Sequence, residues 1–274
     1  MKGLVQLLSS NSQDLHANIA TIMHNLIEMG REEVIVDAGA IKPLVGLLSS
    51  SSIVALEQAL VVVERINRNK DYHALLIDAG VVDSLVKILS KAEPQLHKTV
   101  MEIVTNLFIE DVDKQQFVEA GVAKPMVTFL KSGDAEMKLY AAQVLALVTT
   151  DNTDCITATA AVTVVDSGGQ KFSMIQLLLP LLTAEKVESQ LKEQALLVLE
   201  NLTSVEAIRD AAVAAGADSA IKSILEQEHA NQSLQESSIT QHATKVSENL
   251  VFEFPQKKSG MLSMFSWGKG KRKK

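Results

Sequence analysis

A glycine-containing phrase recurs along this chain at nearly constant intervals. It reads VDAGAIKPLVGLLSS from Val36, IDAGVVDSLVKILSK from Ile77 and VEAGVAKPMVTFLKS from Val118. Weaker copies are VDSGGQKFSMIQLLL from Val165 and VAAGADSAIKSILEQ from Val213. The anchoring glycines, which are 41, 41, 48 and 47 residues apart, are Gly39, Gly80, Gly121, Gly169 and Gly216. A period of this length is typical of a repeat protein, in which each unit packs on its neighbours rather than into one core.

A second recurring pattern lies between the glycines. It can be aligned on one reference position, occupied by Asn25, Arg65, Asn106, Leu147 and Asn201. The residues one after this position, and those two, three, five and six before it, are apolar in all five copies. These offsets predict a helix that is buried over a wide arc, as in the middle of a stack.

Each unit is therefore predicted to contain a short helix, a glycine turn, a second helix and a longer third helix. Glycine suits such a chain reversal because it tolerates positive φ. The phrase AG-[AV]-x-x-x-[LM]-V-x-[LF]-L, followed by a longer helix, resembles the armadillo repeat over roughly residues 3–226. The resemblance implies an all-α, right-handed superhelical solenoid of about five three-helix repeats, whose third helices line a concave groove.

We predict a solenoid over residues 1–250 and a separate tail over 251–274. The expected units are 1–30, which begins partway through a repeat, then 31–71, 72–112, 113–153, 154–207 and 208–250. The third and fourth glycine intervals are longer than the first two, which predicts a longer connection over residues 149–165 and a lengthened helix hairpin near 183–189. The polar segment after Glu226, with Leu234, Ile239, Val246 and Leu250 as a thin apolar stripe, predicts a capping helix.

Composition limits the class of protein. The single cysteine, Cys155, has no internal partner for a disulfide, which favours a reducing compartment. No apolar run approaches the roughly 20 residues that a membrane span needs. We therefore expect a cytoplasmic protein, with membrane association or a nuclear location left open by the tail.

Catalytic and metal-binding signatures are absent from the sequence. It contains no G-x-x-x-x-G-K-[ST], no G-x-G-x-x-G and no H-E-x-x-H, and its six histidines are dispersed. We expect no enzyme activity, no cofactor, no metal and no specific nucleic acid as partner.

The polar positions of the third helices are expected to face the groove. On a helix, the reference position shares a face with the positions four and seven residues before it. This face is polar but mostly uncharged, and its predicted partner-binding residues are Asn25, Arg65, Asn106, Asn201, Thr21, Glu102, Gln143, Tyr140, Gln58 and Gln194.

The asparagines of this face carry a further implication of the resemblance. In armadillo proteins such as importin-α, a ladder of asparagines at this position clamps the backbone of an extended peptide, because an amide both donates and accepts. Asn25, Asn106 and Asn201 match the ladder, whereas Arg65 and Leu147 do not. Importin-α places tryptophans four residues earlier, and their replacement here argues against a nuclear-import receptor. The alternative is that the asparagines only bond neighbouring units.

The tail has the opposite charge to the rest of the chain. From Pro255 onward it holds seven of the 26 basic residues and no acid, so the chain before Pro255 keeps 19 basic against 33 acidic residues, or −14. Its predicted contact residues are Lys257, Lys258, Phe265, Trp267, Lys271, Arg272, Lys273 and Lys274. They suit an anionic membrane, a short nuclear-localisation signal, or an acidic surface on this protein or another copy. A solubilising end is the remaining interpretation.

From these features we expect a non-enzymatic scaffold. It would bind an extended peptide or a helix of a partner protein in the groove of its third helices. The alternative is a membrane-associated adaptor that is anchored by its basic, aromatic tail.

Overall fold

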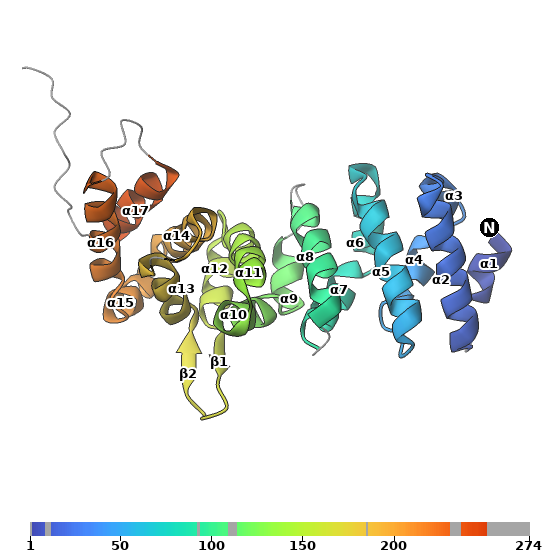
Figure 1. Ribbon diagram of the computed structural model, residues 1–274, viewed down its shortest axis with the longest axis horizontal. Helices are drawn as coiled ribbons and strands as arrows, with labels where there is room; N and C mark the ends of the chain where they lie inside the picture. Colours follow the sequence, from blue (N-terminus) through green and yellow to red (C-terminus); the bar gives the residue numbers. More distant parts are fainter. Residues whose placement is uncertain are drawn as a thin grey trace, which may run out of the picture.

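The protein is an elongated row of stacked helices (Figure 1). The computed structural model describes residues 2–8, 12–91, 94–108, 114–184, 186–230 and 237–250. The predicted tail and all of its contact residues therefore lie outside the described residues. Within the described part, helices dominate and a single short hairpin supplies the strands, so the predicted all-α solenoid is confirmed.

The described helices fall into one partial and five complete units. The partial unit contains α1 (Lys2–Leu7) and α2 (Gln13–Glu28). The complete units are α3 (Glu32–Asp37), α4 (Ile41–Leu47) and α5 (Ile53–Asn67); α6 (His73–Asp78), α7 (Val81–Leu89) and α8 (Pro94–Phe108); α9 (Lys114–Glu119), α10 (Ala123–Ser132) and α11 (Ala135–Val148); α12 (Thr153–Ala160), α13 (Met174–Thr183) and α14 (Ser189–Ser204); and α15 (Glu206–Ala214), α16 (Ala217–Ala230) and α17 (Ser238–Asn249). A 3₁₀ turn, η1 (Lys70–Tyr72), leads into α6.

Local sequence signals explain where these helices begin and turn. Several third helices begin at a side-chain cap; for example, Ser52 Oγ accepts from the backbone N–H of Ala55 before α5, and Asp134 does the same for Met137 before α11. Gly80 and Gly121 adopt φ of 81° and 82° between the first and second helices of their units. That conformation strains any residue with a Cβ, which is why glycine recurs at this turn.

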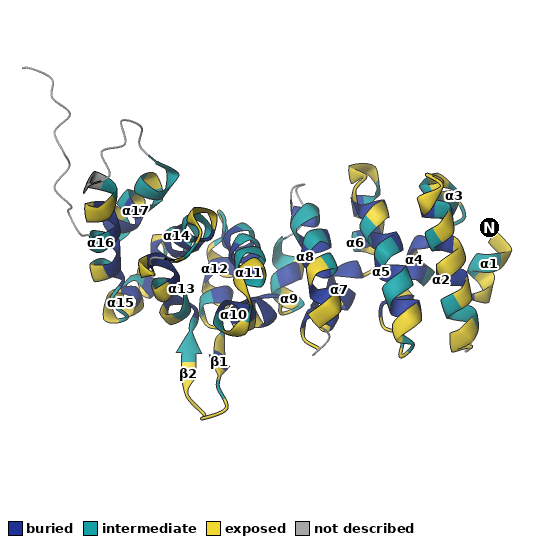
Figure 2. Ribbon diagram, viewed as in Figure 1, coloured by how far each residue is buried: buried dark blue, intermediate teal, exposed yellow. Residues whose placement is uncertain are grey.

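The predicted core positions are buried along the stack (Figure 2). Three residues before the reference position, Val62, Ile103, Val144 and Val198 are all 0% exposed. The exception is Ile22 on α2, which is 40% exposed, and its neighbour Leu26 is only half-buried. Third helices pack in sequence order, α2 on α5, α5 on α8, α8 on α11, α11 on α14 and α14 on α17.

The fourth complete unit departs from the prediction. A β-hairpin of β1 (Thr163–Val165) and β2 (Lys171–Ser173) separates α12 from α13 and projects from the row (Figure 1). Gly169, predicted to reverse the chain between two helices, lies instead in the turn of this hairpin with φ 82°. The predicted longer connection is therefore wrong in part, because it contains α12 and the first strand.

Side chains hold the hairpin against the solenoid. Asp166 Oδ1 accepts from the backbone N–H groups of Gly168, at 2.9 Å, and Gln170, at 2.8 Å, which closes the turn. Lys131 Nζ of α10 lies 4.2 Å from the ring centroid of Phe172 and 3.9 Å from Asp166 Oδ2, so it contacts both sides of the hairpin. The sequence therefore places an extra element, rather than a longer turn, between the two helices.

The last described helix, α17, lies where the capping helix was predicted. It packs on both α14 and α16, so it is also the third helix of a complete unit. Val246 is buried, and Ile239 and Leu250 pack against the core as the stripe predicted, whereas Leu234 lies outside the described residues.

Candidate partner-binding groove

The third helices carry the predicted groove residues along one row of neighbouring elements. Thr21, Asn25 and Arg65 are exposed on α2 and α5. The others are half-buried and continue the row over α5, α8, α11 and α14: Gln58, Glu102, Asn106, Tyr140, Gln143, Gln194 and Asn201. The structure therefore brings these positions into one series. Their role in partner binding stays a prediction.

Asn201 is already bonded to the preceding unit. Its Nδ2 donates to the backbone oxygen of Ala146 and to Oγ1 of Thr149, both at 3.1 Å. The Thr149 hydroxyl hydrogen goes to its own helix, at Leu145 O, so its lone pair is available to the amide. Asn201 therefore makes the bonds between units that the alternative interpretation of the ladder expected, and its role in partner binding stays a prediction.

Asn249 makes the same bridge one unit later. Its Nδ2 donates to Glu200 O and to Thr203 Oγ1, both at 3.2 Å. Asn249 thus occupies the reference position of a sixth third helix, which the sequence interpretation missed. A signal was present, because Glu-Asn-Leu occurs at residues 200–202 and again at 248–250.

The bridge runs in the other direction between α5 and α8. Here Asn67, two residues after the reference position and 1% exposed, donates its Nδ2 to Ile103 O of the following helix at 3.2 Å. Asn106, the ladder residue of α8, makes no side-chain hydrogen bond to the described part of the chain, and neither does Asn25. The amides of Asn25 and Asn106 thus differ from that of Asn201, which is bonded to the preceding helix.

Charged and phenolic side chains cross the junction between α8 and α11. Tyr140 Oη donates to Glu102 Oε1 at 3.5 Å, and Lys98 Nζ lies 2.7 Å from Glu136 Oε1. Burial raises the pKa of Tyr140, and the Glu102 carboxylate raises it further, because both disfavour a phenolate. Two predicted groove residues on different helices thus act as one pair.

A polar hollow of about 560 Å³ lies at the C-terminal ends of α11, α14 and α17. We call it the C-terminal hollow; its lining includes Thr149, Asp151, Asn152, Thr153, Ile156, Glu200, Asn201, Ser204, Lys245, Glu248 and Asn249. Three carboxylates and one lysine line it. Glu200 is already engaged, with His242 Nδ1 at 2.6 Å and Lys245 Nζ at 3.2 Å. Asp151 and Glu248 are exposed, so the hollow presents acceptors to a ligand.

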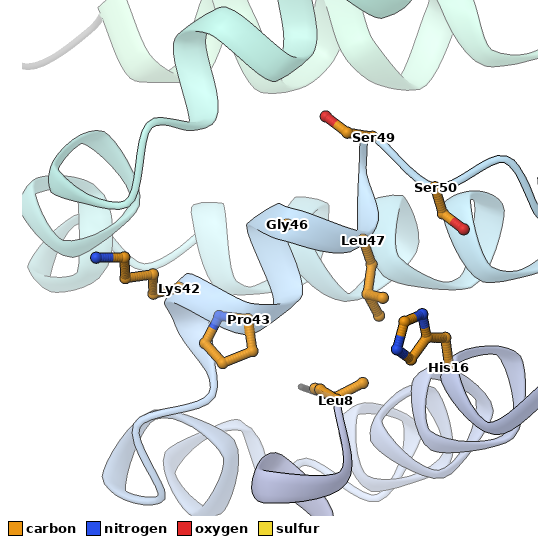
Figure 3. Close-up of a pocket in the computed structure, with 8 residues that line it drawn as sticks. All are labelled: Leu8, His16, Lys42, Pro43, Gly46, Leu47, Ser49 and Ser50. Atoms are coloured by element: carbon orange, nitrogen blue, oxygen red, sulfur yellow. The ribbon is translucent and has the colours of Figure 1, made fainter. Parts of the chain in front are cut away.

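A second hollow, of about 480 Å³, lies outside the groove. It lies among α1, α2 and α4, where Leu8 and Leu47 lie beside the His16 ring and Pro43 lines the opposite side (Figure 3). In the described part of the chain, no cluster of three or more His, Cys, Asp or Glu side chains could hold a metal ion. None of the described helices combines the length and the apolar character needed to cross a bilayer.

Comparison with solved structures identifies the fold. A designed armadillo repeat protein matches at TM-score 0.67 and 22% identity, over 91% of this chain and 99% of its own. Computationally designed armadillo repeat proteins for modular peptide recognition match at TM-score 0.69 and 21% identity, over 92% and 99%. A designed armadillo repeat protein in complex with the peptide (KR)4 matches at TM-score 0.65 and 21% identity, over 91% and 98%. No protein-family model matches the sequence, and a search of curated proteins gave no match.

Proposed function

We propose, from the armadillo-like repeat fold of this chain, that it is a non-catalytic scaffold which binds an extended segment of a partner protein along its third helices. The observation that carries the proposal is the amide of Asn106, which is half-buried on a third helix and makes no side-chain hydrogen bond to the described residues. An amide in that state can pair with a peptide unit of any sequence, since it supplies both a donor and an acceptor.

The C-terminal hollow supplies the charge preference. Its exposed carboxylates, Asp151 and Glu248, and the outward acceptors of Asn201 and Asn249 all favour a donor-rich group. Lysine and arginine side chains carry three and five N–H donors. We therefore propose that the bound segment carries basic side chains at this end. Support comes from the structural neighbour that is in complex with the alternating basic peptide (KR)4.

Fluorescence anisotropy with a labelled (KR)4 peptide tests the proposal on the full chain. We expect saturable binding that weakens several-fold in Asn106→Ala, because a backbone clamp is lost, and in Glu248→Gln, because a carboxylate is lost from the hollow. The matched control is Glu226→Gln, which removes the same charge from an exposed position on the second helix α16.

The control separates groove binding from attraction to the acidic body as a whole. If Glu226→Gln weakens binding as much as Glu248→Gln, the peptide is held by net charge and the groove assignment is wrong. An absence of saturable binding by (KR)4 would overturn the proposed basic preference.

A further inference from the structure

The C-terminal hollow lies beside the point at which the described solenoid joins the basic tail. Helix α17 packs on α14 and supplies three residues of the lining, Lys245, Glu248 and Asn249 (Figure 1). Residues 251–274 therefore continue the chain from the rim of the hollow. Their last part reads Lys-Gly-Lys-Arg-Lys-Lys, and we call these residues, 269–274, the basic run.

The surroundings of the hollow attract cations. The C-terminal ends of α11, α14 and α17 border it, and a helix carries partial negative charge at that end. Lys245 is the one lysine among the lining residues, and its Nζ lies 3.2 Å from the Glu200 carboxylate, so it offsets a group that is already engaged. Asp151 and Glu248 are exposed and form no ion pair with the described residues. These two carboxylates remain to bind a cation that comes from outside the described solenoid.

The basic run has the chemistry proposed above for the ligand of the hollow. It carries five of the 26 basic residues, four of them consecutive at 271–274, and no acid. The chain before Pro255 holds 19 basic against 33 acidic residues, so the run and the solenoid attract each other. We propose that the basic run docks in the C-terminal hollow of its own chain and competes there with a basic partner segment. This inference rests on the basic preference stated under the proposed function.

The covalent connection strengthens the competition. Lys269 follows Leu250, the last described residue of the solenoid, by 19 residues. An unstructured chain of that length spans roughly 22–26 Å on average, which is enough to turn back from α17 to the neighbouring α14. A ligand tethered in this way acts at an effective concentration on the order of 1 mM. If the run binds with a dissociation constant of about 0.1 mM, the apparent dissociation constant of a partner rises about tenfold.

Docking of the run leaves the middle of the groove open. The hollow is lined by residues of α11, α12, α14, α17 and the turn after α11, whereas Asn106 lies on α8. A partner segment can therefore contact Asn106 while the run occupies the hollow. It displaces the run only if it brings basic side chains of its own to Asp151 and Glu248. The run thus makes the scaffold more selective for partners that carry a basic segment.

Fluorescence anisotropy with the labelled (KR)4 peptide tests the competition on full-length variants. In the neutral-run variant, every basic residue of the run becomes glutamine: Lys269→Gln, Lys271→Gln, Arg272→Gln, Lys273→Gln and Lys274→Gln. We expect this variant to bind (KR)4 about tenfold more tightly than the wild type. The matched control changes the net charge equally at five exposed lysines of the solenoid: Lys2→Gln, Lys42→Gln, Lys87→Gln, Lys124→Gln and Lys171→Gln.

The outcomes separate this proposal from the proposed function. An equal gain in the control would show that net charge sets the affinity, and would overturn docking of the run. Equal affinities of the wild type and the neutral-run variant would also overturn it, while leaving the basic preference of the hollow intact. If neither of them binds (KR)4, the basic preference itself is wrong, and the docking inferred from it is wrong as well.

Disulfide formation tests the docked position directly. Under mild oxidation, Gly270→Cys in the run should link to Ser204→Cys in the lining of the hollow within one molecule. The link should form at least about tenfold faster than with Ser219→Cys, an exposed position on α16 outside the hollow. Cys155 is completely buried and should not take part. Equal rates at the two serine positions, or a disulfide-linked dimer in place of the internal link, would overturn the proposal.

Discussion

The two halves of the groove use the same residue type in different ways. In the C-terminal half, Asn201 and Asn249 donate to a threonine and a carbonyl of the preceding helix. In the N-terminal half, Asn25 and Asn106 make no side-chain hydrogen bond to the described residues, although their neighbours in sequence are similar. An asparagine at this position therefore bonds the preceding helix in one half and makes no side-chain bond to the described residues in the other.

The residue two positions after the reference explains the difference. In α11 and α14 this residue is Thr149 or Thr203, whose hydroxyl donates to its own helix and leaves a lone pair for the next unit. In α5 it is Asn67, which reaches forward to Ile103 O itself. Neighbouring third helices are hydrogen-bonded in both cases. Only where the residue is threonine does the bond use the ladder asparagine of the following helix.

The largest expected effect is on the free energy of unfolding, which should fall more for an asparagine substitution in the C-terminal half than for one in the N-terminal half. Asn201→Ala should lower the free energy of unfolding by about 1–3 kcal/mol, because two hydrogen bonds between third helices are lost. Asn106→Ala should cost under about 0.5 kcal/mol, as expected for a partly exposed side chain without a hydrogen bond to the described residues. Urea unfolding followed by circular dichroism measures both variants. Equal losses would contradict the division into two halves.

The next prediction, with a smaller expected effect on stability, gives Asn106 the kind of hydrogen bond that Asn201 makes. In Asn67→Thr, the new hydroxyl can donate to its own helix and offer a lone pair to Asn106, as Thr149 does for Asn201. Asn106→Ala should then cost about 0.5–1 kcal/mol more in the Asn67→Thr background than in the wild type. The same double-mutant cycle built on Asn67→Ala is the control, because alanine offers no acceptor. A coupling of the same size in both cycles would show that the residue after the reference position does not decide the bridge.

Much of the stack could be predicted from the sequence because burial recurs with the helical period. The apolar positions at fixed offsets are buried in every unit except at Ile22 and Leu26 of α2, the first third helix that the structure describes. The hairpin could not be predicted from its glycine. Gly169 and Gly121 both have φ 82°, and positive φ is needed in a hairpin turn as much as between two helices.

The sequence also could not predict which ladder asparagines are hydrogen-bonded to a neighbouring helix, for a different reason. Asn106 and Asn201 are both followed by leucine on a third helix, so local sequence does not distinguish them. The acceptor that binds Asn201, Thr149, lies 52 residues earlier and becomes a neighbour only through the stacking of α11 on α14. Assigning this hydrogen bond requires the relative position of α11 and α14. The inserted hairpin between them affects that position.

The smallest expected effect is at the junction of the two halves, where Tyr140 of α11 meets Glu102 of α8. Because the pKa of Tyr140 is raised above its ordinary value of 10.0, the folded protein gains stability below the unfolded pKa and loses it as pH rises through the folded one. Glu102→Gln should lower this pKa toward 10.0 without reaching it, since burial, the largest cause, remains. Glu136→Gln should lower it less, because that carboxylate contributes less than Glu102. Ultraviolet titration in a Tyr72→Phe background, which leaves Tyr140 as the remaining tyrosine, measures both shifts. A larger shift in Glu136→Gln would show that the pair joining α8 to α11 is not the contact described here.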